Sequence, residues 1–286
     1  MSDPRSHYVT VLDRELHYME WGERGKPPLV MWHGLARTGR DFDDIARALA
    51  GERHIVVPDT IGRGFSQWSP APEREYCYDF YARLATGLLD ALKLATVDWL
   101  GASMGGAIAI RAGAGPLKGR IRRLVLNDIG PEVAPAAIER IRSYAGKPPR
   151  FDRVSELEVY FRQIYKPFGH LTDAQWHRLT ESSARRLPDG GITTHYDPKM
   201  VLQFELHPND NDQWPQWDAL DCEVLCLRGA QSDLLLPETA AAMTRRGPRC
   251  RLVTVEGCGH APALNVPEQI ALVRDFLSAP RASTVS

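Results

Sequence analysis

Apolar and polar residues follow two alternating patterns along the chain. Short apolar runs end in turn residues, as in "PLVMWHG", "HIVVPD", "VDWLGAS", "RRLVLND", "EVLCLRG" and "CRLVTVEG". Between these runs, apolar residues recur at helical spacing, for example at Phe80, Leu84, Leu88 and Leu92. Strands that are apolar at nearly every position are covered on both faces. The pattern therefore predicts an α/β fold in which helices flank a mostly parallel sheet.

The beginning of the chain has a different pattern. The stretch "HYVTVLDRELHYMEW" alternates apolar and polar residues and turns at Asp13 and Arg14. Such alternation is typical of strands with one covered face. We therefore expect an antiparallel hairpin at one edge of the sheet.

The alternation of strands and helices stops between residues 131 and 217. This stretch contains no convincing buried strand and several amphipathic helical patterns, and a buried strand resumes at "EVLCLRG". We predict a core made of residues 1–130 and 218–286, into which residues 131–217 are inserted as a helical cap. An insertion at the carboxyl edge of an open sheet covers the place where ligands bind in such folds.

Helix-start signals support the helical reading of this inserted segment. Ser155 with Glu158, and Thr172 with Gln175, have the spacing of capping boxes. Asp197 directly precedes a proline, which is another common helix start. These signals predict helices that begin near each of the three positions.

The overall charge gives no reason to expect a polyanionic partner. The 35 basic and 36 acidic residues leave a formal net charge of −1, which favours neither nucleic acid nor an anionic membrane surface. No run of roughly 18 apolar residues is present, and the first residues lack the pattern of a signal peptide. We expect a cytoplasmic protein with a small-molecule partner, no nucleic acid and no membrane. The oligomeric state stays open, a homodimer included.

Cysteine usage does not point to a metal site. The five cysteines are odd in number and fit no zinc-binding pattern. We expect buried or free thiols.

Small residues surround one serine in "TVDWLGASMGGAIAIRAG". This stretch predicts a strand, a sharp turn and a helix, with Ser103 at the turn. Such a turn forces the central residue into a strained backbone conformation and pushes its side chain outward. Gly101 and Gly105 come so close that a β-carbon would clash. The pattern predicts an exposed nucleophile.

A serine nucleophile needs a base and an acid group that orients the base. Of the nine histidines, His260 stands just after an apolar strand in a glycine-rich loop, so we expect it to be the base. Asp233 and Asp128 each follow a strand. We prefer Asp233, because it lies one strand upstream of the histidine, and keep Asp128 as the alternative.

The remaining requirement is a pair of donors for an oxyanion. Backbone N–H groups suit this role because they are already aimed. We expect one from Met104, at the start of a helix, and one from Leu35, which directly follows a His-Gly pair. His33 is expected to support that loop.

Together these residues resemble the α/β-hydrolase fold family over nearly the whole chain. The resemblance implies an eight-stranded, mostly parallel sheet with a helical cap after the sixth strand. It also implies hydrolysis through an acyl-serine without a metal or an organic cofactor. The motifs that carry it are His33–Gly34, Asp59-x-x-Gly62-x-Gly64-x-Ser66, Gly101-x-Ser103-x-Gly105, Asp233 and Gly259–His260.

Within this family, the residue at the nucleophile position distinguishes the reactions that the members catalyse. Similar epoxide hydrolases and haloalkane dehalogenases carry aspartate where this chain has Ser103, so a carboxylic ester hydrolase is the leading hypothesis. C–C bond hydrolases often have Ser-Met-Gly-Gly, as here, but tend to have tryptophan where this chain has Ala261. C–C bond or lactone hydrolysis is the alternative, and a small-molecule receptor is the hypothesis from another class.

The substrate of such an ester hydrolase is expected to be small and largely apolar. Aromatic residues at helical spacing in the inserted segment are the candidates for the pocket wall. They are Phe161, Tyr165, Trp176 and Phe204.

Overall fold

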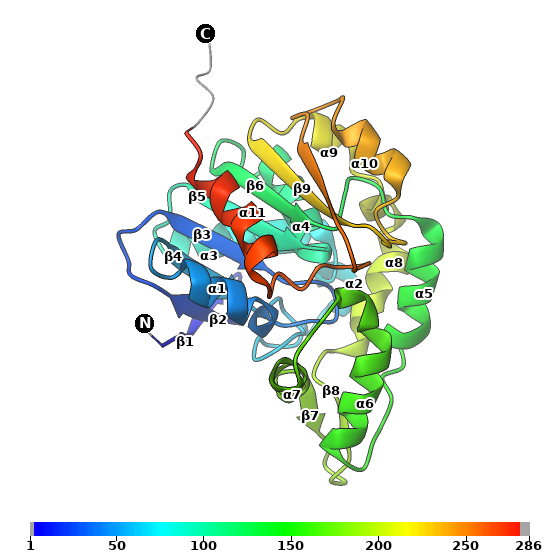
Figure 1. Cartoon of the computed structure of the whole chain (residues 1–286). Helices are drawn as coiled ribbons and strands as arrows, with labels where there is room; N and C mark the ends of the chain where they lie inside the picture. The colour runs from blue at the N-terminus through cyan, green and yellow to red at the C-terminus, as the bar shows by residue number, and fades with distance from the viewer. Residues whose placement is uncertain (1–2, 281–286) are drawn as a thin grey trace.

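One eight-stranded sheet forms the centre of the molecule, in a computed structural model that describes residues 3–280. Its strand order is β1-β2-β4-β3-β5-β6-β9-β10 (Figure 1). β1 pairs antiparallel with β2 and β2 with β4, and all other pairs are parallel. The predicted mostly parallel sheet with an antiparallel edge hairpin is therefore confirmed. The strands are β1 (Arg5–Val11), β2 (Arg14–Trp21), β3 (Pro28–Trp32), β4 (His54–Pro58), β5 (Val97–Ala102), β6 (Ile121–Asn127), β9 (Glu223–Gly229) and β10 (Arg251–Val255).

Helices cover both faces of this sheet, as the apolar strands require. α1 (Asp43–Leu49) and α11 (Pro267–Ser278) pack on one face, and α3 (Tyr78–Ala91) and α4 (Met104–Ala114) on the other (Figure 1). Successive residues of a strand point to opposite faces. In β3, Leu29 and Met31 accordingly belong to the core under α1 and α11, whereas Val30 and Trp32 belong to the other. The short helices η1 (Gly39–Phe42), α2 (Pro72–Glu75) and α10 (Pro237–Met243) complete this part.

The inserted segment lies between β6 and β9 in the chain, and its elements α5, α6, α7, β7 and β8 lie at the right and bottom of Figure 1. It contains five α-helices and one two-stranded antiparallel sheet, β7 with β8, which the sequence did not predict. Each of these strands has three residues, too few to show a strand pattern. The elements are α5 (Pro135–Ala145), α6 (Val154–Ile164), η2 (Lys166–Phe168), α7 (Asp173–Glu181), β7 (Ala184–Arg186), β8 (Ile192–Thr194), η3 (Pro198–Val201), α8 (Leu202–Leu206), η4 (Pro208–Asn211) and α9 (Trp214–Asp218).

Helices begin near all three predicted positions, and two of the three predicted caps are confirmed. The Thr172 side chain accepts a hydrogen bond from Gln175 N, and the Gln175 side chain accepts one from Thr172 N, ahead of α7. Asp197 caps η3 by accepting from Lys199 N. A helix also begins near Ser155, since α6 starts at Val154, but the predicted capping pair is wrong, because Arg153 and Glu156 form the capping box in place of Ser155 and Glu158.

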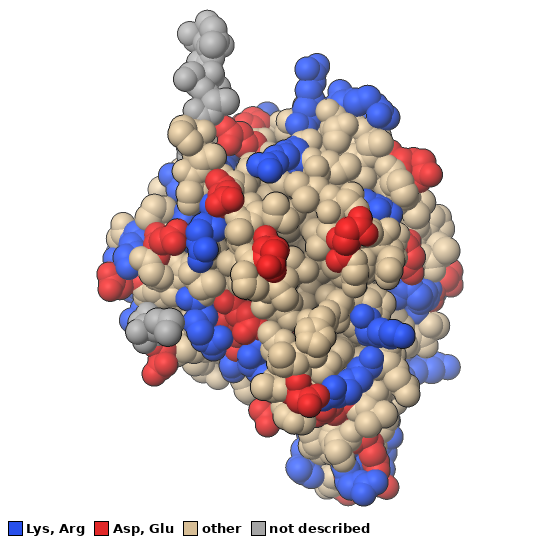
Figure 2. Space-filling model, viewed as in Figure 1, with Lys and Arg blue, Asp and Glu red and all other residues tan. Residues whose placement is uncertain are grey.

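The surface mixes charges of both signs. On the face drawn in Figure 2, acidic and basic side chains are interspersed, as the small net charge leads one to expect. No helix within residues 3–280 has the length and apolar character needed to cross a membrane. All five cysteines are buried free thiols.

Candidate active site

Ser103 stands at the sharp turn between β5 and α4. Its backbone has φ 50° and ψ −120°, a conformation that costs free energy in a residue with a side chain. A β-carbon on Gly101 would lie 2.4 Å from the carbonyl carbon of Gly105. One on Gly105 would lie 1.9 Å from the carbonyl oxygen of Trp32. The structure thus confirms why small residues surround this serine.

The glycine-rich loop after β10 brings His260 to this serine. His260 Nε2 lies 2.9 Å from Ser103 Oγ, which is hydrogen-bond distance. The other ring nitrogen, Nδ1, lies 2.8 Å from Asp128 Oδ2. Three segments that are far apart in the sequence therefore form one line of hydroxyl, imidazole and carboxylate.

Asp128 is well held in this position. Its side chain is fully buried, and its backbone has φ 57°. Asp128 Oδ1 accepts from Gly229 N at 2.9 Å, and Oδ2 accepts from Ser232 Oγ at 2.6 Å. Together with His260, these donors balance a carboxylate that would be costly to bury alone.

The expected contact between Asp233 and His260 is wrong. Asp233 is more than half exposed and forms a bidentate ion pair with Arg140 of α5, at 2.8 and 2.9 Å. Its loop follows β9 as predicted, but the side chain turns to the inserted segment. Asp128, the alternative in the sequence, occupies the predicted place of the acid.

The loop after β3 passes close to Ser103. A β-carbon on Gly34 would lie 3.5 Å from Ser103 Cβ. The next residue, Leu35, lines the cavity described below, and its carbonyl oxygen accepts from the buried Arg63 Nε at 2.9 Å. Met104 is the first residue of α4, where a backbone N–H has no acceptor within its own helix.

His33 supports this loop, as predicted. It is fully buried, its Nδ1 donates to Gly34 O, and its Nε2 accepts from Thr60 N. Burial lowers the pKa of His33 to about 4, so the ring is neutral near pH 7. A neutral ring with both nitrogens engaged is a structural group.

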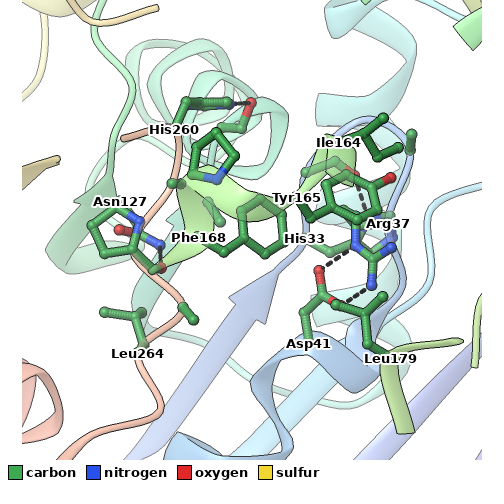
Figure 3. Close-up of a pocket in the computed structure, with 18 of the residues that line it drawn as sticks. His33, Arg37, Asp41, Asn127, Ile164, Tyr165, Phe168, Leu179, His260 and Leu264 are labelled. Carbon is green, nitrogen blue, oxygen red and sulfur yellow. Dashed lines mark hydrogen bonds and ion pairs between the residues drawn. The ribbon is translucent and has the colours of Figure 1, made fainter. Parts of the chain in front are cut away.

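Ser103 and His260 line a cavity of about 440 Å³. Figure 3 shows His260 in the wall of this cavity. Loops at the carboxyl ends of the strands form one side of the cavity, and α5, α6, η2 and α7 of the inserted segment form the other. Core residues that line it include His33, Leu35, Arg37, Asp41, Ser103, Asn127, His260 and Leu264, and inserted residues include Ile141, Tyr144, Ile164, Tyr165, Phe168 and Leu179.

Of the four predicted wall residues, only Tyr165 lines this cavity. Phe161 and Trp176 are buried in the inserted segment's own core, with Leu157 and Ile192. Phe204 packs against the main core instead. The prediction is wrong for Phe161 and Trp176 because their helices bury their apolar faces within the inserted segment, and wrong for Phe204 because its side chain packs on the main core away from the cavity.

Sequence reasoning missed Asn127, the residue directly before Asp128. Its Nδ2 donates to Pro262 O at 2.8 Å and so ties the end of β6 to the loop of His260. The signal was available as a second polar residue at the end of the apolar run "RRLVLND". Within the described part of the chain, no group of three or more His, Cys, Asp or Glu side chains is arranged to hold a metal ion.

The sheet order and the sharp serine turn define the class of α/β hydrolases. Comparison with known families agrees, because the model described as "Alpha/beta hydrolase family" matches residues 29–272. The chain therefore belongs to the alpha/beta hydrolase family.

Individual relatives cover almost the whole chain. The 3-hydroxybutyrate-oligomer hydrolase of Cupriavidus necator is 39% identical, over 97% of this chain and 99% of that protein. The 2-hydroxymuconate semialdehyde hydrolase of Pseudomonas sp. strain CF600 is 26% identical, over 91% of this chain and 89% of that protein. A crystal structure of an alpha/beta hydrolase from Novosphingobium aromaticivorans superposes with a TM-score of 0.86 at 34% identity, over 97% of this chain and 99% of that one. By family, this chain is a hydrolase.

Proposed function

We propose that this chain is a serine hydrolase that cleaves carboxylic esters through an acyl-serine intermediate. The observation that carries the proposal is the line from Ser103 Oγ through His260 to Asp128 at the wall of a cavity. A serine hydroxyl is a weak nucleophile near neutral pH, and an adjacent oriented imidazole makes it a strong one.

In the acylation step, Ser103 Oγ attacks the acyl carbonyl while His260 Nε2 accepts its proton. Asp128 holds the imidazole by its Nδ1–H and stabilises the positive charge that forms on the ring. His260 then donates the proton to the leaving alcohol. Water repeats the sequence and frees the acid from Ser103.

The negative oxygen of each tetrahedral intermediate needs donors that are fixed in advance. The backbone N–H groups of Leu35 and Met104 are the proposed pair. Met104 N–H lies at the positive end of α4, which favours an anion there. Arg63 Nε donates to the carbonyl oxygen of Leu35, in the peptide that follows the proposed donor, and so restrains the residue that carries the second N–H.

Residues 131–217 are proposed to act as a cap that closes the substrate cavity. One side of the cavity belongs to this segment, so its helices decide which small esters enter. The relative from Cupriavidus necator is named for 3-hydroxybutyrate oligomers, which supports esters of short hydroxy acids as the substrate class.

Hydrolysis of a C–C bond or a lactone is the second candidate. It is favoured by the Ser-Met-Gly-Gly sequence at Ser103 and by the relative named as a semialdehyde hydrolase. A panel of 4-nitrophenyl butyrate, a lactone and a vinylogous diketone acid separates the candidates by kcat/KM. A C–C hydrolase would prefer the diketone acid over the ester.

Replacing the proposed nucleophile tests the main claim. Ser103→Ala should lower kcat/KM for 4-nitrophenyl butyrate by at least about 1,000-fold, because nucleophile and base act as a unit. Labelling by an organophosphate should disappear, and the circular dichroism spectrum should stay the same. Ser143→Ala is the control, since this exposed hydroxyl bonds to Arg140 O of its own helix. Undiminished hydrolysis by Ser103→Ala would refute the proposal. Very slow turnover by the wild type, together with a ligand-dependent rise in Tm, would indicate a receptor instead.

A further inference from the structure

A buried arginine lies in the wall of the cavity that contains Ser103. Arg37 follows the loop after β3 and lines the cavity, and only 6% of its side chain is exposed. A β-carbon on Gly34 would lie 3.5 Å from Ser103 Cβ and 3.7 Å from Arg37 Cγ. The stem of the arginine therefore starts beside the serine.

One end of this guanidinium is left without a partner. Arg37 Nε and Nη2 donate to the two carboxylate oxygens of Asp41, at 2.8 and 2.5 Å. Arg37 Nη1 is buried, and no acceptor among the described residues meets hydrogen-bond geometry with it. The Tyr165 hydroxyl is the polar group that interacts with this guanidinium besides Asp41. Figure 3 shows the guanidinium between Asp41 and Tyr165, whose ring centre is 4.7 Å from Arg37 Cζ. Buried donors are almost always satisfied, so an empty donor in a cavity wall points to a ligand atom.

Arg37 stays protonated and positively charged. Although burial works against this charge, the nearby Asp41 carboxylate raises the pKa of Arg37. Tyr144 and Tyr165 line the same cavity, and burial raises the pKa of both phenols, so their hydroxyls keep their protons. The neighbourhood of Arg37 therefore offers donors.

The other arginines of the cavity wall are paired with carboxylates and add no net charge. Arg140 pairs with Asp233, Arg178 with Asp44, and Arg40 with Asp43, which does not itself line the cavity. The preference for an anion therefore rests on Arg37 Nη1.

We propose that Arg37 binds a carboxylate on the alcohol part of the ester, so that the enzyme selects esters of hydroxy acids. This inference rests on the proposed ester hydrolysis at Ser103. It deepens that function by assigning the recognition of the substrate's acid end to one side chain. A carboxylate fits because a hydrogen bond between two charged groups is stronger than one between neutral groups.

Two esters of nearly the same shape test the inference. 3-(Butanoyloxy)butanoic acid and its primary amide have one ester bond each and form the same butanoyl-serine, but only the acid carries a carboxylate. The wild type should prefer the acid by about 10- to 100-fold in kcat/KM, the effect of one hydrogen bond to a charged group. Arg37→Gln should bring the acid-to-amide ratio close to one.

A double variant and a control variant separate the loss of the Arg37 donor from other effects of the substitution. Arg37→Gln/Asp41→Asn removes both charges together, which avoids an unpaired buried carboxylate. It should abolish the preference as well. Arg47→Gln removes an arginine that pairs with Asp44 on α1 but does not line the cavity, and it should keep the wild-type ratio.

The outcomes distinguish the two proposals. If the wild type cleaves 4-nitrophenyl butyrate but treats acid and amide alike, the carboxylate anchor is wrong and ester hydrolysis stands. The anchor is also wrong if the Arg37 variants still prefer the acid over the amide. If Arg40→Gln loses this preference while the Arg37 variants keep it, the carboxylate is bound by Arg40 and not by Arg37. If the wild type cleaves none of these esters, the proposed function itself fails.

Discussion

Two aspartates follow neighbouring strands, and only one of them directs its side chain to His260. β6 and β9 are adjacent in the sheet, so Asp128 and Asp233 both follow strands at the same edge. The left-handed backbone of Asp128 turns its carboxylate to His260, where Gly229 N–H and the Ser232 hydroxyl hold it. Asp233 meets Arg140 instead. The candidate acid is therefore chosen by local backbone geometry.

Exchanging each carboxylate for an amide tests this choice. Asp128→Asn should lower kcat for 4-nitrophenyl butyrate by about 1,000- to 10,000-fold, because an amide favours the wrong tautomer of His260. Asp233→Asn is the matched variant and should cost less than about tenfold. A larger loss in Asp233→Asn than in Asp128→Asn would show that the acid has been assigned to the wrong residue.

At the scale of elements, the turn between β5 and α4 depends on close contact with β3. A side chain at Gly105 would enter the backbone of Trp32, which cannot move without breaking the pairing of β3 with β5. α4 is buried along most of its length between the sheet and its neighbours, so it cannot shift away either. The close contact between α4 and β3 therefore holds Ser103 at the sharp turn, where its side chain lines the cavity.

Gly105→Ala should therefore destabilise the protein by at least about 2 kcal/mol, since overpacking against backbone is relieved only by shifting elements. Urea unfolding measures the loss. Gly51→Ala is the control, because a β-carbon there meets nothing within 4 Å, and it should stay within about 0.5 kcal/mol of the wild type. Equal midpoints for the two variants would contradict the close contact.

Across the whole molecule, two buried histidines link stability to pH. Burial lowers the pKa of His33 to about 4 in the core, and burial with the nearby Arg37 charge lowers that of His195 to about 4 in the inserted segment. In the unfolded chain both titrate near their ordinary value of about 6.5. The folded molecule therefore resists protonation that the unfolded chain accepts.

The free energy of unfolding should therefore have its full value above about pH 6.5 and fall as the pH drops towards 4. Between these pH values the unfolded chain binds more protons than the folded chain. The loss is on the order of 3 kcal/mol for each histidine. His195→Asn should flatten this dependence, while His170→Asn, at an exposed position, should leave it unchanged. Identical pH profiles of urea midpoints in wild type and His195→Asn would refute the argument.

Local patterns predicted most of the fold. The apolar runs located all the parallel strands, and the alternating first residues located the edge hairpin, because each pattern reflects how many faces of a strand are covered. The short β7 and β8 escaped, since three residues do not establish a period. The wall residues Phe161, Trp176 and Phe204 were misplaced because helical periodicity shows that a face is buried without showing against what.

The sequence by itself determined the sheet, the inserted segment and the sharp turn that exposes Ser103, because those follow from residue size and from periods of two or about four residues. Only the tertiary structure decided that Asp128 and not Asp233 meets His260, that Tyr165 alone of the four aromatics lines the cavity, and that Arg37 keeps one donor free. These outcomes depend on side-chain directions and on contacts between segments far apart in the chain, which no local pattern encodes.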